Sequence, residues 1–487
     1  MSLDALFRRL QRFPMLKIAL CVVGGILLHR LFALPIGGLI ALFALAAWGS
    51  IRYQQPLCYL TALLAAGYLL AAWHDRPVAT LPKGEAMLRV EVLDDGTRRT
   101  RTNRYEAQLL GWQELPEGVE HQSEGRLWLY ADTLLTLHGG EQLRFEGRID
   151  PFAQDTAVWA QQMARKGYLG RCYMASYHTP QRIEGRTASL HLWATRTLDK
   201  RLEERTDEAA ALMHAMTIGN RTRLTPTLRE SYARSGFSHL VALSGLHVGM
   251  LFLVVNLLLG WLKLLHRGHR IQHLLAIAVV WLFVAVAGFP ISAIRAAVMC
   301  TLLQWALFSS APYRAVNSWA AAALLLLAYN PAWLFDIGFQ LSFLAVGGIL
   351  LVGLPLCRRV RGGNRLLNLL TDALLISITA SLFTMPLAAH HFGLWPLAGI
   401  VMNPPAILLA TGVVACSLLL LVLPPLAPLL RPLALGGAAA LNYLAEEVAS
   451  MTALCPEFRP SGAMTGAIYL FFVLLILAAW CREPKKM

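Results

Sequence analysis

The sequence has few charged residues, which make up 15% of its 487 positions. Soluble domains usually carry about 25% charged residues, so the deficit argues against a soluble protein. Hydrophobic residues account for 56% and gather in long apolar segments. Length and composition together predict a polytopic α-helical membrane protein.

The chain also has no CxxC pair among its eight cysteines, so the usual sequence sign of a redox or zinc motif is missing. Most cysteines fall within apolar segments, where free cysteine behaves as a small hydrophobic residue. Cys172 and Cys455 fall in segments expected outside the cytoplasm, and the sequence leaves open whether they pair. His266, His269 and His273 have ligand-like spacing, but a basic cytoplasmic loop is the favoured interpretation. We expect no metal and no cofactor.

About twelve apolar segments are candidates for membrane-spanning helices, three within residues 1–73 and nine after residue 235. Several are shorter than the roughly 20 residues that a bilayer requires, and others contain glycine or proline. Broken or re-entrant helices are therefore expected where the backbone is packed in protein or lines a cavity. The segments are 15–32, 36–50, 56–73, 239–265, 272–287, 290–308, 318–329, 335–356, 367–389, 394–423, 432–454 and 462–480.

Basic loops give the expected orientation in the membrane. With the N-terminus inside and each segment crossing once, the basic stretches 263–270, 358–365 and 482–486 all fall on the inner side, as the positive-inside rule requires. This predicts cytoplasmic termini and places residues 74–186 outside the cytoplasm. The formal net charge of +14 follows from the same rule, and attraction of a polyanion is the alternative explanation.

Residues 74–186 differ from the rest, because polar and apolar residues alternate there over short stretches such as 88–93, 126–130 and 141–149. Turn signals such as Asp95-Gly96 separate these stretches. The pattern predicts an inserted small β-barrel of about five strands.

A basic turn in this β-domain has two interpretations, which are a solvated hairpin tip and a contact surface for nucleic acid. Its arginines are Arg98, Arg99, Arg101 and Arg104. Aromatic residues pose a similar question, because aromatics in strands usually belong to the core but could stack on bases, as in oligonucleotide-binding barrels. These residues are Trp128, Tyr130, Phe145, Tyr168 and Tyr173.

Residues 187–235 are expected to form an amphipathic helix and then short linker helices. In the amphipathic helix, Leu190, Trp193, Leu198 and Leu202 share one side and basic residues occupy another, which suits a membrane surface. Gly219-Asn220-Arg221 interrupts the short helices that follow. Non-helical backbone is therefore expected near the membrane face.

The most informative stretch is Gly236 to Gly249, GFSHLVALSGLHVG, at the mouth of an apolar segment. Polar and ionisable groups at that depth are costly and indicate a functional site by default. His239 and His247 would share a face if the helix were continuous, although Gly245 could break it. With no carboxylate or cysteine nearby, a metal site or a catalytic group through Ser244 is disfavoured against a packed, hydrogen-bonded helix break.

Other polar residues lie inside later apolar segments. Arg295 either reaches the outer interface or lines an aqueous path. Gln340 and Ser342 lie in an otherwise apolar span, and Asn403 precedes two prolines that must break or kink a helix. Together these groups could line a hydrophilic path that contacts phosphates weakly at many places.

Four motifs in this order resemble those of the ComEC-type competence proteins, the inner-membrane channels that take up transforming DNA. They are GNR at 219–221 with the 236–249 stretch, GFPISAIRA at 288–296, DIGFQLSFLA at 336–345 and GIVMNPP at 399–405. The resemblance implies a non-enzymatic channel that passes single-stranded DNA into the cytoplasm of a bacterium during natural transformation. It also implies an OB-like fold for the β-domain and a competence-type channel domain at 236–487.

The resemblance further implies the DNA-path residues and the partners of the channel. The motif positions are His239, Ser244, Gly245, His247, Arg295, Gln340, Ser342 and Asn403. Besides single-stranded DNA and membrane lipids, the implied partners are a periplasmic DNA-binding competence protein, a cytoplasmic DNA translocase or strand-binding protein, and a separate nuclease.

One departure from the family's pattern bears on the nuclease. Many family members end in a metallo-β-lactamase-like domain, thought to degrade the non-transported strand, and this sequence has no HxHxDH-type cluster. Nuclease activity is therefore expected from a separate protein. Two rival functions stay open: an intramembrane hydrolase using His239, Ser244 and His247, and a transporter of another anionic polymer or lipid.

Overall fold

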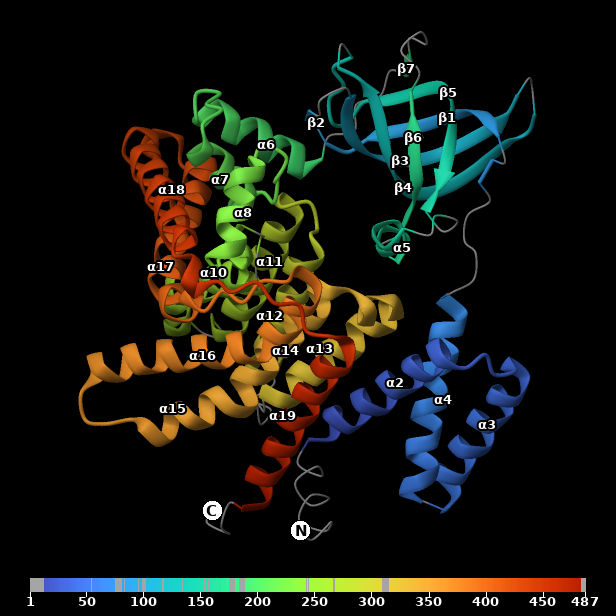
Figure 1. The fold of residues 1–487 in the computed structure, drawn as a ribbon, viewed down its shortest axis with the longest axis vertical. Helices are drawn as coiled ribbons and strands as arrows, with labels where there is room; N and C mark the ends of the chain where they lie inside the picture. The colour runs from blue at the N-terminus through green and yellow to red at the C-terminus, as the bar shows by residue number, and fades with distance from the viewer. Residues whose placement is uncertain are drawn as a thin grey trace. The chain divides into compact units, whose positions relative to one another are not determined.

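The computed structural model divides into two compact units (Figure 1). Met1–His74 together with Arg201–Met487 form a helical unit, and Asp75–Lys200 form a unit built on a β-sheet. The structure describes residues 13–53, 55–74, 81–82, 84–94, 96–98, 102–115, 118–133, 135–152, 155, 157–165, 167–174, 180–183, 189–241, 243, 245–265, 268–308 and 315–482.

Eight helices in the described part of the chain are long and apolar enough to cross a membrane, and three shorter apolar helices accompany them. The expected helical membrane protein is therefore confirmed, whereas the number of about twelve spans stays a prediction. The eight candidate spans are Pro14–Leu31, Ile36–Tyr53, Pro56–His74, His247–Leu264, Gly268–Val286, Ile337–Val360, Arg365–Phe392 and Ala398–Val422. A further long helix, α18 (Ala427–Ser450), carries Asn442, Glu446 and Glu447 and is more polar.

Two glycines form the crossing of α2 (Pro14–Leu31) and α4 (Pro56–His74), the first and third described helices. Between them in the chain lies α3 (Ile36–Tyr53). A Cβ atom added at Gly25 of α2 or Gly67 of α4 would collide with the backbone of the other helix, so small residues permit this close crossing. Tyr68 then fixes the turn into α3, because its hydroxyl donates to the Phe32 carbonyl at 2.9 Å and accepts from Leu34 N–H at 2.7 Å.

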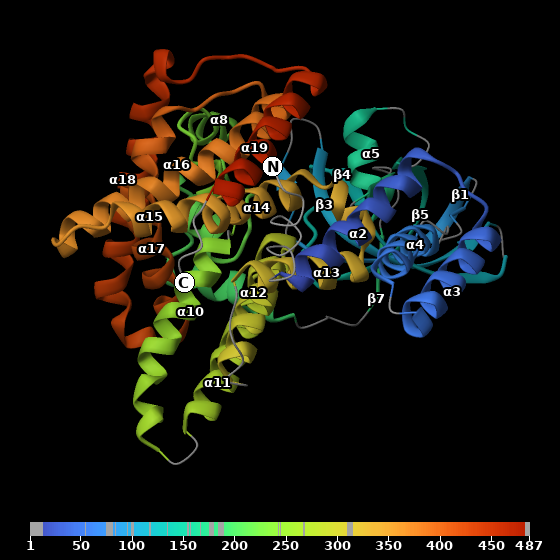
Figure 2. The same ribbon diagram turned by 90° about the horizontal axis from the view of Figure 1, so that it is seen from below.

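The rest of the helical unit contains three antiparallel hairpins, α10–α11, α15–α16 and α17–α18 (Figures 1 and 2). Between the first two hairpins the chain forms α12 (Ile291–Phe308), α13 (Ala315–Tyr329) and α14 (Ile337–Gly348), and α14 runs through the π-helical turn Ile349–Gly353 into α15. The remaining bounds are α10 (Gly245–Leu258), α11 (Gly268–Val286), α15 (Leu354–Val360), α16 (Arg365–Phe392), α17 (Ala398–Val422) and α19 (Gly462–Arg482).

A proline inside α16 is accommodated by a tyrosine from α19. Pro386 interrupts the hydrogen-bond ladder of α16. The Tyr469 hydroxyl enters the gap, donating to the Phe383 carbonyl at 2.8 Å and accepting from Leu387 N–H at 3.2 Å. This hydroxyl takes the place of the direct backbone hydrogen bond between residues 383 and 387. It also connects α19 to α16.

Replacing Tyr469 with phenylalanine is expected to destabilise the protein by about 1–2 kcal/mol, because both backbone groups lose their partner in apolar surroundings. The measurement is unfolding of the purified protein in micelles. Tyr443→Phe is the matched control, since Tyr443 on α18 is 66% exposed. Equal unfolding midpoints for the two variants would contradict this account of the kink.

The segment before the central motif is more deeply packed than a surface linker. Helix α7 (Glu208–Thr217) is apolar on nearly all sides, and residues 210–217 are all buried, as expected for a helix with no polar face. It packs against α17 and α18, and α8 (Pro226–Arg234) also packs against α18 (Figure 1). Asp207 caps α7 by accepting a hydrogen bond from Ala210 N–H at 2.8 Å.

The amphipathic helix α6 (Leu190–Arg201) buries only part of the apolar face predicted for a membrane surface. Leu192 and Leu198 are buried, whereas Trp193 is 53% exposed. Leu192 packs on Gly139 of the β-domain, and Arg196 donates to the Gly139 carbonyl at 3.2 Å. The helix therefore covers part of its own domain with Leu192, which lies outside the predicted apolar face, and leaves Trp193 of that face exposed.

The β-domain contains one sheet of seven strands in the order β1-β3-β4-β6-β5-β7, with β2 paired to β3. Strand β1 pairs with both β3 and β5, so each of the five strands β1, β3, β4, β6 and β5 pairs with two others of these five. Only the β4–β6 pair is parallel among the strand pairs of the described residues. The strands are β1 (Glu85–Val92), β2 (Thr97–Arg98), β3 (Thr102–Glu114), β4 (Glu120–Asp132), β5 (Gln142–Pro151), β6 (Tyr168–Tyr173) and β7 (Gln181–Ile183).

The core of the β-domain consists of the inward residues of these strands. The alternation expected from the sequence is present in β1, where every second residue is buried. Phe145 is 3% exposed in this core, which corrects its assignment to a possible base-stacking surface. Cys172 is also buried in the core, and both Cys172 and Cys455 are free thiols, so the structure has no disulfide between them. Burial raises the pKa of the Cys172 thiol to about 12.

Candidate functional site

Glycines from two different motifs hold the turn after α8 against α17. Gly236 has a φ of +82°, in the left-handed region that glycine adopts without strain. A Cβ added there would lie 3.3 Å from Gly399 Cα, and a Cβ added at Gly399 would lie 2.9 Å from the Ser235 carbonyl oxygen. Two motifs 163 positions apart in the sequence therefore meet through backbone that has no room for side chains.

A second contact joins the central motif to α12. The helix is interrupted between α9 (Ser238–Val241) and α10, which begins at Gly245. In this break the Leu243 carbonyl accepts a hydrogen bond from Ser292 Oγ at 2.6 Å. A Cβ added at Gly245 would lie 3.3 Å from Ala296 Cβ. The expected helix break is present, and α12 supplies a hydrogen bond that the interrupted helix does not.

The GNR motif approaches the end of α11. Gly219 has a φ of +85°, and a Cβ placed on it would lie 3.6 Å from the Ala287 carbonyl oxygen. Asn220 stabilises the following turn by accepting from Thr222 N–H at 3.0 Å and from Thr222 Oγ at 2.6 Å. This contact places the first motif beside the start of the GFPIS motif.

Arg295 places a buried positive charge at the start of α14. Its side chain on α12 is 5% exposed, and its Nε has no hydrogen-bond partner in the described part of the chain. Its terminal nitrogens lie 3.9 and 4.0 Å from the position of a Cβ added at Gly338, a residue that is itself exposed. Asp336 lies within electrostatic range and caps α14 by accepting from Phe339 N–H at 2.9 Å. Because Gly338 has no side chain, none from this residue lies beside the buried guanidinium at the start of α14.

The two histidines of the central motif have different surroundings. His247 is 1% exposed on α10. His239 on α9 is exposed, and its Nδ1 lies 3.1 Å from the Gly236 carbonyl oxygen. Ser244 lies outside the described residues. The described residues include no group of three or more His, Cys, Asp or Glu side chains that could hold a metal.

Asn403 lies where α17 passes through two prolines. Pro404 cannot donate to the Ile400 carbonyl, and Ser377 Oγ of α16 donates to it instead at 2.7 Å. Asn403 is 9% exposed, and its Oδ1 has no partner within the described residues. A buried amide oxygen without a partner is costly, so Asn403 is a candidate for contact with a bound molecule.

Gln340 and Ser342 lie on the first turns of α14. Gln340 Nε2 donates to the Leu334 carbonyl at 2.8 Å, which holds the short helix Pro331–Phe335 against the start of α14. Ser342 is half-buried. The structure thus brings Gln340 to the same helix end as Arg295, where its side chain supports the local backbone.

The β-domain carries a second candidate surface, made by outward residues of β3, β4 and β6. The register pairs Arg104 with Tyr130 and Tyr130 with Tyr173, so these side chains share one face of the sheet. The Arg104 guanidinium lies 4.5 Å from the centre of the Trp128 ring, a cation–π contact. Arg99 and Arg101 lie outside the described residues, as does the side chain of Arg98.

Two stacked aromatic pairs give this surface its open rings. Trp159 of α5 (Val158–Arg165) stacks on Trp128 with ring centres 5.8 Å apart, and Tyr173 stacks on Tyr130 with centres 4.9 Å apart. The outer members, Trp159 and Tyr173, are 41% and 51% exposed. They therefore present rings on which flat groups could stack.

Glu106 sits between basic and phenolic groups on the same face. It accepts from Tyr168 Oη at 2.9 Å and from Arg126 Nη1 at 3.3 Å. Burial, with a smaller contribution from the Glu106 charge, raises the pKa of Tyr168. Tyr168 is therefore a neutral hydrogen-bond donor at physiological pH, and part of the charge of Arg126 is compensated.

Comparison with known proteins gives one family. A family model described as competence protein matches residues 216–485. The chain belongs to the competence protein family. The four motifs lie within the matched residues, and the β-domain lies outside them.

Three relatives of this competence protein are similar over part of their length. ComE operon protein 3 of Bacillus subtilis (strain 168) is 29% identical over 202 residues, 40% of this chain and 24% of that protein. Competence protein ComA of Neisseria gonorrhoeae is 27% identical over 284 residues, which cover 56% of this chain and 38% of that protein. An uncharacterized protein of Aquifex aeolicus (strain VF5) is 28% identical over 186 residues, which cover 38% of this chain and 41% of that protein. The matched part thus spans well under half of each relative, and no solved structure matches.

Several residues of the competence motifs make structural contacts that were not predicted from the sequence. Ser292, Asp336 and Gly399 each make a contact described above, yet they appeared in the sequence only as parts of motif strings. The sequence carries only a weak indication of the role of Ser377. Pro404 inside a helix predicts that the Ile400 carbonyl, four residues earlier, needs another hydrogen-bond donor. Which helix supplies that donor depends on tertiary packing.

Proposed function

We propose that this competence protein is a non-enzymatic channel that conducts single-stranded DNA across the bacterial inner membrane during natural transformation. The observation that carries the proposal is the meeting of four polar motifs at helix breaks inside an apolar bundle. Polar and charged groups at membrane depth are costly and mark substrate paths. The competence family, and the word competence in the printed name of the Neisseria gonorrhoeae relative, support DNA uptake as the process.

Arg295, His247 and Asn403 are the proposed polar contacts of the strand. All three are buried, and the Arg295 Nε and Asn403 Oδ1 have no partner in the described part of the chain. A guanidinium can donate to a phosphate, and an amide oxygen can accept from a base. A few isolated contacts of this kind hold a moving strand weakly at each point, which transport requires. His239, Ser244, Gly245, Gln340 and Ser342 complete the proposed set of path residues.

We also propose that the ring of five strands is an OB-like barrel whose β3–β4–β6 face contacts DNA before transport. An exposed tryptophan and an exposed tyrosine beside Arg104 suit single-stranded nucleic acid, because stacking is tolerant of base identity. The proposed domains follow the bounds expected from the sequence. They are the membrane helices of residues 1–73, the barrel at 74–186, the helices at 187–235 and the channel domain at 236–487.

The double variant Trp159→Ala/Tyr173→Ala tests this surface. Each stacking contact contributes about 1–3 kcal/mol, so removing two is expected to weaken binding of a single-stranded oligonucleotide by the purified full-length protein at least about 30-fold. Trp193→Ala is the matched control, because Trp193 on α6 is 53% exposed and outside the proposed face. Unchanged affinity in the double variant would remove this surface from the account.

The proposed location is the inner membrane, with both termini in the cytoplasm and the β-domain outside it. An ion pair between Glu203 and Arg431 joins the turn after α6 to the N-terminal part of α18, next to the α17–α18 turn. If α17 and α18 each crossed the membrane, the turn after α6 and the α17–α18 turn would lie on opposite sides of it. The ion pair therefore does not fit a topology in which every helix crosses the membrane once. A hairpin returns to the side from which it started, so the placement of the three basic segments is unaffected.

The proposed partners follow from the proposed process. A periplasmic DNA-binding competence protein would deliver the duplex, and a separate nuclease would remove the second strand. A cytoplasmic translocase or strand-binding protein would receive the transported strand.

A deletion strain scored at two stages tests the proposed function. Labelled DNA should still become protected outside the inner membrane, whereas its arrival in the cytoplasm should be lost and should return with the wild-type gene. Ser244→Ala should leave cytoplasmic arrival largely intact, because the channel needs no nucleophile. Loss of arrival with Ser244→Ala at normal protein level would favour a hydrolase, and unchanged arrival in the deletion strain would exclude the channel.

A further inference from the structure

The turn between α15 and α16 combines four exposed arginines with exposed leucines. Residues 357–372 contain one acidic residue, Asp372, to balance these four positive charges. The exposed basic residues are Arg358, Arg359, Arg361 and Arg365. The turn therefore carries a net positive charge where the chain passes from one candidate membrane helix to the next.

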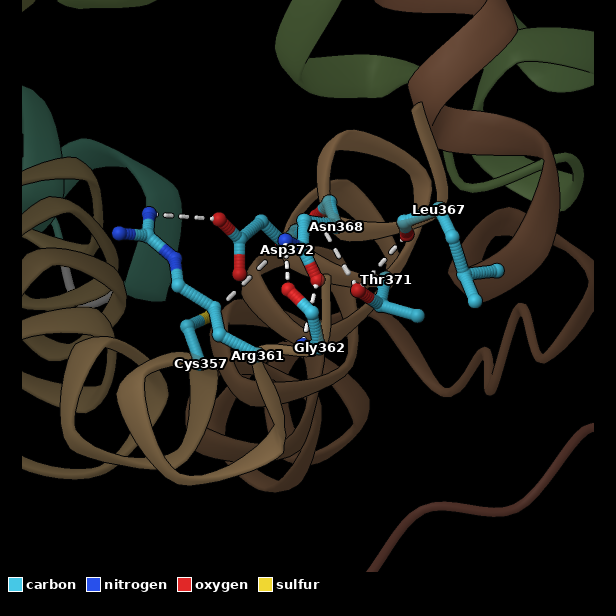
Figure 3. Close-up of polar contacts among 7 residues, drawn as sticks. All are labelled: Cys357, Arg361, Gly362, Leu367, Asn368, Thr371 and Asp372. Atoms are coloured by element: carbon cyan, nitrogen blue, oxygen red, sulfur yellow. Dashed lines mark hydrogen bonds and ion pairs between the residues drawn. The ribbon is translucent and has the colours of Figure 1, made fainter. Parts of the chain in front are cut away.

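Hydrogen bonds within the turn hold its backbone in one conformation (Figure 3). Gly362 N–H donates to Asn368 Oδ1 at 2.9 Å, and Asn368 Nδ2 donates back to the Gly362 carbonyl at 2.8 Å. Asn364 caps α16 by accepting from Leu366 N–H at 2.9 Å. A turn fixed in this way presents its arginines with little further ordering, which lowers the cost of binding a ligand.

One arginine of the turn is occupied within the protein. Arg361 Nη2 lies 2.9 Å from Asp372 Oδ2 (Figure 3), so this pair neutralises the carboxylate on the second turn of α16. Arg358 and Arg365, at the two helix ends that flank the turn, are not part of this pair. Their charges are directed to the surroundings of the turn.

The apolar side chains next to these arginines decide what kind of partner fits. Leu366, Leu367, Leu369 and Leu370 are 66%, 58%, 67% and 55% exposed. They occupy the first turns of α16, within about 8 Å of Arg365 along the helix axis. A phosphate-bearing nucleic acid would leave these leucines in water, whereas a lipid would cover them with acyl chain while its headgroup meets the arginines.

We propose that the α15–α16 turn is a binding site for anionic phospholipid. The headgroup phosphate is held by Arg358 and Arg365, and the acyl chains cover the leucines at the start of α16. The site is independent of DNA transport, and it requires only that α14–α15 and α16 lie in a bilayer. It anchors this hairpin at the anionic surface of the membrane.

The test compares lipid binding by the full-length protein and its Arg358→Gln/Arg365→Gln variant. Each arginine near an anionic surface contributes roughly a fivefold gain in affinity, so the double variant should bind phosphatidylglycerol about 25-fold more weakly. Binding is measured by exchange of labelled phosphatidylglycerol in micelles, with phosphatidylcholine as the neutral lipid. The control is Arg148→Gln/Arg182→Gln, which removes the same charge from β-domain arginines that are 71% and 56% exposed.

A second variant, Leu366→Asn/Leu370→Asn, keeps the arginines and removes apolar contact. It should also weaken phosphatidylglycerol binding, and it should weaken phosphatidylcholine binding to a similar degree. Equal affinity of the wild-type protein for the two lipids would overturn the proposal. So would a loss of single-stranded oligonucleotide binding in the arginine variant with phosphatidylglycerol binding unchanged, because the partner of the turn would then be nucleic acid.

Discussion

Replacing Arg295 with glutamine is expected to lower transformation at least about 30-fold, because a hydrogen bond to a charged group contributes about 2 kcal/mol and this guanidinium is the buried charge at the start of α14. The DNA should continue to accumulate outside the inner membrane, since the β-domain surface is untouched. The measurement is the ratio of transformants to protected periplasmic DNA at equal protein level.

Two further variants separate a role in the path from a role in folding. Arg295→Lys keeps the charge and should restore part of the loss, because an ammonium still attracts phosphate although it lacks the planar fork of a guanidinium. Gly338→Ala adds a Cβ 3.0 Å from Asp336 Oδ1, which caps α14, and 3.9 Å from the guanidinium. It removes no charge but disturbs this cap, and should reduce transport moderately. Normal transformation by Arg295→Gln would show that the buried charge is not needed for passage of the strand.

Replacing Gly399 with valine is expected to destabilise the helical unit by about 3 kcal/mol or more, because a side chain forced into a packed contact displaces backbone. The added Cβ would lie 2.9 Å from the Ser235 carbonyl oxygen and 3.2 Å from Gly236 Cα. These are backbone atoms of a turn with a left-handed glycine, so no side-chain rotation can relieve the contact. The turn after α8 should separate from α17, and transformation should fall with it.

The matched control is Gly412→Val on the same helix. A Cβ at Gly412 has no neighbour within 4 Å, so the same substitution there is expected to leave stability nearly unchanged, because valine has a slightly better helix propensity than glycine. Unfolding of both purified variants in micelles is the measurement. Equal stability would mean that the Gly236–Gly399 contact does not hold the two motifs together.

The sequence was sufficient to predict elements whose signal is local. Apolar segments gave the helices, alternation gave the strands of the β-domain, and the two histidines around Gly245 suggested a helix break that the structure has between Val241 and Gly245. Each of these depends on residues within one or two turns of one another. The proposed channel residues were likewise found one motif at a time.

The contacts between motifs could not be predicted in the same way. Gly236 and Gly399 are each unremarkable glycines in the sequence, and only their approach makes them intolerant of a side chain. Phe145 and Tyr173 are both aromatic residues of strands, but Phe145 faces the core and Tyr173 the surface, since the register depends on which strands pair. The buried faces of α6 and α7 also depend on partners far away in the chain.

The most direct test of the channel is photocrosslinking of a strand halted during import by a bulky group at its trailing end. A photoreactive residue at His239, a proposed path residue that is exposed on α9, should crosslink to DNA in cells that still transform. The same residue at Leu257, which is 79% exposed on α10, should crosslink to lipid and not to DNA. DNA crosslinks at Leu257, or none at His239, would contradict a path for DNA along the polar motifs.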